Sequence, residues 1–92
     1  MPVQRRRNPK ATRQPEDYFG EALRERRKEV GLTQEEVAFQ SGYHPTYIGQ
    51  LERGAKNPSL RAIMSLAAVL KVQASELIGR VESLAAIQLR KP

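Results

Sequence analysis

The sequence contains no cysteine and no tryptophan, a single histidine and few aromatic residues. Without cysteine the chain can form neither disulfides nor thiolate metal sites. The single histidine, His44, would have only carboxylates as fellow ligands, so no metal is predicted. No apolar run approaches the roughly 20 residues that a membrane span needs, and no apolar segment of a secretory signal follows the basic N-terminus. These absences favour a cytoplasmic protein without a membrane partner.

The residue sets that usually carry catalysis are also missing. The sequence shows no arrangement of a nucleophile, a base and an orienting group, and it has no glycine-rich phosphate loop. Its 92 residues leave little chain to enclose a pocket. We therefore expect a protein that is not an enzyme and that uses no cofactor.

The net charge of +6 is distributed unevenly along the chain. Residues 1–15 contain five basic residues and no acidic one, whereas residues 16–92 contain eleven basic and ten acidic residues. The first segment also holds three prolines and almost nothing apolar, so residues 1–15 are predicted to form a disordered basic arm. This arm is either a solubilising leader or a segment that contacts DNA.

The remaining sequence predicts helices, and no strand-like alternation appears in it. Pro15 opens a helix with acidic residues in its first turn, and its apolar face would combine Phe19, Ala22, Leu23, Arg26, Arg27 and Val30. A later helix is capped by Ser59, and its predicted core stripe is Leu60, Ile63, Met64, Ala67 and Leu70. A further helix begins near Ala74 or Ser75.

Two short helices and a tight turn are predicted between Gly31 and Gly54. Thr33 and Glu36 form a capping box, so the first of these helices begins at Gln34. Ser41-Gly42 ends it, Pro45 suits the first turn of the next helix, and Gly54 follows the end of that helix at Arg53. Two helices joined by a tight turn make a helix-turn-helix, whose second helix reads base edges in the DNA major groove.

The second of these helices has two different faces. Ile48 and Leu51 share an apolar face, with Glu52 beside them. Hydrogen-bonding residues occupy the opposite face, namely Thr46, Gln50 and Arg53, and Gly49 next to them would allow another surface to approach closely.

With these features the sequence resembles the phage-repressor-like (Cro/repressor, Xre-type) helix-turn-helix family. The resemblance covers about Tyr18 to Ile78 and rests on Arg27, Gly31-Leu32-Thr33-Gln34, Ala38, Gly42, Ile48, Leu51-Glu52-Arg53-Gly54 and Asn57-Pro58-Ser59-Leu60. It implies an all-α, compact bundle of five helices over residues 16–79, in which the second and third helices form the helix-turn-helix. It also implies a sequence-specific, double-stranded DNA-binding transcriptional regulator, of the kind found among phage repressors, restriction-modification controllers and antitoxins.

The resemblance further implies which residues contact DNA. Gln34 would bind a phosphate, with Thr33 mainly a cap, and Thr46 and Gln50 would read bases. The full predicted set is Thr33, Gln34, His44, Pro45, Thr46, Tyr47, Gln50, Arg53, Lys56 and Asn57. Arg27 and Glu52, charged residues on apolar helix faces, are expected to form a structural pair.

Residues 80–92 carry apolar side chains beyond what a small core needs. Val81, Leu84 and Ile87 are therefore predicted to form a homodimer interface, and a symmetric dimer would bind a palindromic operator. Gly79 either lies inside the last helix or ends it. The alternative function is a protein-interaction adaptor of the multiprotein-bridging coactivator type, although the polar residues Thr46 and Gln50 favour DNA.

Overall fold

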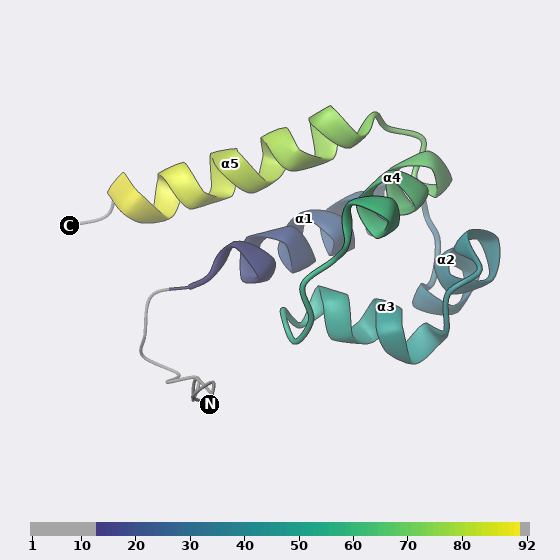
Figure 1. The fold of residues 1–92 in the computed structure, drawn as a ribbon. Coiled ribbons are helices and arrows are strands. Elements are labelled where there is room, and N and C mark those ends of the chain that lie inside the picture. The colour runs from purple at the N-terminus through teal and green to yellow at the C-terminus, as the bar shows by residue number, and fades with distance from the viewer. Residues whose placement is uncertain (1–12, 91–92) are drawn as a thin grey trace, which may run out of the picture.

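The computed structural model describes residues 13–90, and this part of the chain contains five α-helices and no strand. In chain order these are α1 (Pro15–Glu29), α2 (Gln34–Ser41), α3 (Pro45–Glu52), α4 (Leu60–Val69) and α5 (Ala74–Arg90). Helix α1 packs against both α5 and α3, while α2 packs on α3 and α4 (Figure 1). The predicted all-α bundle of five helices is confirmed. Residues 1–12, most of the predicted basic arm, lie outside the described residues.

The helix caps that the sequence predicts at Thr33 and Ser59 are present and mark the starts of α2 and α4. Thr33 Oγ1 accepts a hydrogen bond from the backbone N–H of Glu36 at 3.0 Å, and the Glu36 carboxylate accepts one from the N–H of Thr33 at 2.8 Å. Ser59 Oγ likewise accepts from the N–H of Ala62 at 3.0 Å. Helix α3 ends at Glu52, one residue earlier than predicted. Arg53 is its C-cap, and Gly54 follows with a left-handed φ of 73°. These caps satisfy backbone groups that helix ends would otherwise leave unpaired.

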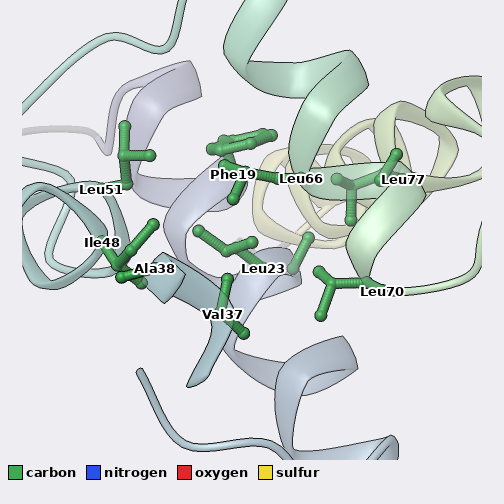
Figure 2. Close-up of a cluster of buried hydrophobic side chains, with 11 residues drawn as sticks. Phe19, Leu23, Val37, Ala38, Ile48, Leu51, Leu66, Leu70 and Leu77 are labelled. Carbon is green, nitrogen blue, oxygen red and sulfur yellow. The ribbon is translucent and has the colours of Figure 1, made fainter. Parts of the chain in front are cut away.

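The core lies between the five helices, each of which contributes buried side chains to it. Figure 2 shows its side chains converging from all five helices, with Leu23, Ile48 and Leu66 completely buried. Helices α1 and α3 lie close together at Gly20, where an added Cβ would meet the carbonyl oxygens of Leu51 and Glu52. Only a residue without a side chain fits there.

The prediction for the core face of α4 was wrong at two positions. Leu60 and Met64 are 72% and 58% exposed, whereas Ala62 and Leu66, which the stripe omitted, are buried. Helix α4 is apolar around most of its circumference, so sequence periodicity alone does not show which side the neighbouring helices cover. Leu60 and Met64 therefore form an exposed apolar strip at the start of α4.

Helix α5 runs without a break through Gly79, which resolves the two alternatives for that residue. Val81 and Leu84, predicted at a dimer interface, pack partly buried against the chain's own core, while Ile87 is 54% exposed. Arg80 ties α5 to α1 through hydrogen bonds of 2.9 Å from both Nη atoms to the Glu29 carboxylate. Much of the predicted apolar surplus therefore belongs to the contact between α1 and α5.

Helix α4 is the most apolar helix of the described structure. Within the helices of the described region, no single one is long and apolar enough to cross a membrane. Helix α4 and the Ala74–Ile87 part of α5 meet those criteria only when taken together, and they are bent by 105° relative to each other. The buried side of α4, with Ala62 and Leu66, packs inside the bundle.

Candidate nucleic-acid interface

The turn between α2 and α3 is built by one left-handed residue. Gly42 has a φ of 81° and caps α2, with its N–H donating to the Ala38 carbonyl at 2.9 Å. The N–H of Tyr43 donates to the same carbonyl at 3.0 Å. A left-handed φ costs little only for glycine, so the turn depends on this residue. It fixes the start of α3 relative to α2.

His44 caps the N-terminus of α3 with its side chain. Its Nδ1 accepts a hydrogen bond from the backbone N–H of Thr46 at 3.0 Å. A nitrogen that accepts in this way carries no proton, so the neutral ring holds its proton on Nε2. Because His44 is exposed, this Nε2–H is available as a donor to a phosphate oxygen or a base acceptor.

The outer face of α3 carries the predicted recognition residues. Pro45, Thr46 and Arg53 are exposed, and Gln50 is partly buried. Ile48 and Leu51, on the opposite face, are fully buried. The helix thus presents hydrogen-bonding side chains outward while its apolar side anchors it in the core.

Tyr47 lies beside this face and packs locally. Its ring is 5.0 Å from the ring of Tyr43, centroid to centroid, at an interplanar angle of 47°. Burial raises the pKa of the Tyr47 hydroxyl, which therefore stays protonated and able to donate at neutral pH. Tyr47 supports the turn as well as bordering the recognition face.

A polar network connects the start of α2 to α3 and α1. Gln34 Nε2 donates to Glu52 Oε1 at 3.0 Å, and the same carboxylate accepts from Arg27 Nε at 2.6 Å. Arg27 also donates to the Leu32 carbonyl at 2.9 Å. The predicted Arg27–Glu52 pair is present, and Gln34 joins it from α2, in agreement with the contact between this glutamine and the recognition helix that the family resemblance implies.

The predicted DNA-contacting residues fall into two groups on the described structure, one at the start of α2 and one along α3 and the loop after it. Thr33 and Gln34 lie at the N-terminus of α2, while His44, Pro45, Thr46, Tyr47 and Gln50 lie on or before α3. Arg53 is the C-cap of α3, and Lys56 and Asn57 are exposed in the turn that follows. Gln34 is joined to α3 through Glu52, so the two groups are held together.

Sequence reasoning also missed how the end of the basic arm is held. Arg13, assigned to that arm, forms an ion pair of 3.0 Å with Glu21 and lies 4.8 Å above the Tyr18 ring. The spacing of Arg13 and Glu21 across the start of α1 is the only sequence signal for this contact. Arg13 is therefore part of the folded unit.

Comparison with known proteins agrees with this geometry. A protein-family model described as helix-turn-helix matches residues 23–77. An uncharacterized HTH-type transcriptional regulator, y4dJ, from Sinorhizobium fredii is 46% identical over 52 residues, covering 56% of this chain and 68% of the relative. The restriction-modification controller protein C.AhdI from Aeromonas hydrophila superposes with a TM-score of 0.66 at 45% identity, covering 67% of this chain and 94% of the controller.

A third relative has been solved in complex with DNA. The master regulator for biofilm formation SinR, in complex with DNA, has a TM-score of 0.62 and 31% identity, covering 65% of this chain and 97% of SinR. The fold and the α2–α3 geometry define a helix-turn-helix transcriptional regulator. The chain belongs to the helix-turn-helix family. These relatives give no support to the coactivator-type adaptor.

Proposed function

We propose that the protein regulates transcription by binding a specific double-stranded DNA operator through α3. The observation that carries the proposal is the outer face of α3, where exposed or partly buried polar side chains face away from a helix side that is fully buried. A helix anchored in this way can enter the major groove without disturbing the core. SinR, a relative of similar fold, was solved with DNA bound.

Each group of residues has a distinct role in this proposal. Thr46 and Gln50 contact base edges, since glutamine can pair with adenine through two hydrogen bonds and threonine can serve several bases. Gln34, His44, Arg53, Lys56 and Asn57 contact the sugar-phosphate backbone or the groove edge, and such contacts set position and affinity. No step of this function requires catalysis or a cofactor. Among the described residues, no group of three or more potential metal ligands is placed to hold an ion.

A second copy of the chain is the proposed protein partner. One recognition helix reads only a few base pairs, whereas two related by a two-fold axis would read half-sites about 34 Å apart. Exposed apolar side chains remain for such a contact at Ile87 on α5 and at Leu60 and Met64 on α4. A regulator of this kind acts where the DNA is, which in a bacterial cell is the cytoplasm.

Selection of binding sites from random DNA duplexes tests the proposal directly. We expect enrichment of a palindromic motif whose half-sites are one helical turn apart. A substitution of both Thr46 and Gln50 by alanine serves as the control, because both side chains lie on the outer face and their loss leaves the core intact. Failure of the native protein to enrich any motif would contradict the proposed function.

A further inference from the structure

Gly49 lies in the middle of α3, where it is buried and borders the face that carries Thr46, Gln50 and Arg53. Glycine destabilises a helix interior relative to alanine, so its presence in an eight-residue helix calls for a compensating reason. Two other glycines also lie inside helices, Gly20 in α1 and Gly79 in α5. Their surroundings differ from those of Gly49 in an informative way.

The three positions differ in what an added methyl group would meet. At Gly20 it would meet the backbone of α3, and at Gly79 nothing lies within 4 Å. At Gly49 it would lie 3.1 Å from Arg53 Nη1 and 3.7 Å from Gln34 Oε1. Among these three helix-interior glycines, Gly49 is the one with side chains of the predicted DNA-contacting set next to it, namely Arg53 and Gln34.

The position of Arg53 follows from helix geometry. Side chains on a helix lean toward its N-terminus, so a residue lies over the one four positions earlier. Arg53 therefore folds back over Gly49, and its guanidinium reaches the vicinity of the Gln34 amide group. An added methyl group would lie 3.1 Å from Nη1, tighter than the ordinary van der Waals contact that begins at 3.4 Å, so the guanidinium would have to shift by a few tenths of an ångström.

We propose that Gly49 is a positioning residue for DNA binding, which it supports by leaving room for Arg53 beside Gln34. This inference rests on the proposed function. The Gln34 amide nitrogen carries two hydrogens, of which Glu52 accepts one. Its second N–H and the guanidinium of Arg53 are donors on the same stretch of surface, and the oxygens of one DNA phosphate can accept from both.

The test compares Gly49→Ala with Gly79→Ala as a matched control. Each variant replaces a helix-interior glycine, so we expect each to raise the melting temperature by a few degrees. Binding to the selected operator, measured by fluorescence anisotropy, should weaken by roughly three- to tenfold for Gly49→Ala, the scale of one charged hydrogen bond. It should be unchanged for Gly79→Ala.

A double-mutant comparison shows whether Arg53 carries the effect. Gly49→Ala should weaken binding in the native background and have no further effect in Arg53→Gln, because the group that it displaces is already gone. The affinity loss should be equal on the operator and on a scrambled duplex. The slope of log affinity against log salt should become shallower by up to about 0.9, as expected when one phosphate contact is lost.

Several results would overturn the inference. One is a Gly49→Ala protein that binds like the native protein. Another is a loss that persists in the Arg53→Gln background, which would mean that DNA itself approaches Gly49. A loss confined to the operator would assign Arg53 to a base instead of a phosphate. Failure of the native protein to bind any duplex would contradict the proposed function itself, and this result is distinguishable from the others.

Discussion

The guanidinium of Arg27 and the carboxylate of Glu52 form a two-point ion pair, with Nε 2.6 Å from Oε2 and Nη2 3.0 Å from Oε1. The two side chains are only 12% and 4% exposed. The hydrogen bond to Glu52 raises the pKa of Arg27. The pair joins α1 to α3 beneath the recognition face, and Gln34 from α2 completes it. Helices α1, α2 and α3 thus meet at one carboxylate.

Replacement of Glu52 by alanine should strongly destabilise the fold. Arg27 would keep its charge at a mostly buried position without its partner, at a cost of about 3–5 kcal/mol in the free energy of unfolding. Chemical denaturation measures this cost. Glu36→Ala is the control. It removes an exposed carboxylate from the capping box of α2 and should cost only as much as the loss of one helix cap. A loss below about 0.5 kcal/mol for Glu52→Ala would show that the pair contributes no more than a surface contact.

Stability at low pH should depend on Glu29. Hydrogen bonds from Arg80 and then Arg26 lower the pKa of Glu29 from an ordinary 4.5 to about 2. Because the folded-state pKa is below the unfolded one, this contact stabilises the fold above pH 4.5, and the stabilisation is lost as the pH falls toward 2. The site is exposed, so salt should weaken the effect.

Melting temperatures of the native protein and of Glu29→Gln at a series of pH values measure this dependence. We expect a difference between them at neutral pH that disappears as the pH approaches 2. Glu35→Gln, which changes an exposed carboxylate of α2, is the control. A difference between native protein and Glu29→Gln that stays constant over the whole range would contradict the assignment.

Gln50 and Gln34 should respond differently to replacement by alanine. Gln50→Ala should cost about 1–3 kcal/mol of binding free energy on the selected operator and relax the preference at one base pair. Gln34→Ala should weaken binding to every duplex by a similar factor, because a phosphate contact carries no base identity. Affinities on the operator and on a scrambled duplex separate the two effects. A changed base preference in Gln34→Ala would reverse the assigned roles.

Local sequence signals predicted the helix-turn-helix well. The capping box at Thr33, the helix end at Ser41-Gly42 and the Ser59 cap each act within a few residues, so the sequence itself shows them. The Arg27–Glu52 pair was also predictable, because two charges on apolar helix faces require each other. Features of this kind are local or are constrained by the cost of burying a charge.

Features that depend on how helices pack were less predictable. The exposure of Leu60 and Met64 depends on which side of α4 is covered by α2 and α5, and that side is set by the crossing of whole helices. The close approach at Gly20 and the Gln34 side chain beside Gly49 likewise involve residues of two elements. The role of Arg80, which holds α5 on α1, had no local signal for the same reason.

Dimerisation should depend on exposed apolar residues, and not on Val81 and Leu84, which pack against the core of their own chain. Ile87→Asp should shift the protein toward monomer in sedimentation at micromolar concentration, since it places a charge on an exposed apolar position of α5. Met64→Asp makes the matching change on α4. A monomer produced by Met64→Asp alone would place the interface on α4. A native chain that is monomeric both free and on its operator would contradict the dimer altogether.

The basic segment before α1 should add affinity without adding much sequence information. Because Gln14 and Asp17 form a capping box and Arg13 pairs with Glu21, the deletion that leaves the fold intact removes residues 2–12. This segment carries four cations, Arg5, Arg6, Arg7 and Lys10. We propose that these cations contact the sugar-phosphate backbone of the bound DNA.

Deleting residues 2–12 should weaken binding most at low salt. Each lost phosphate contact should flatten the slope of log affinity against log salt by about 0.9, so a decrease of a few units per protomer is expected. The base preference should survive, because Thr46 and Gln50 remain in place. A full-length variant with the four cations replaced by glutamine separates charge from length and should reproduce the effect of the deletion. If the slope is unchanged in both variants, the segment acts only as a solubilising leader.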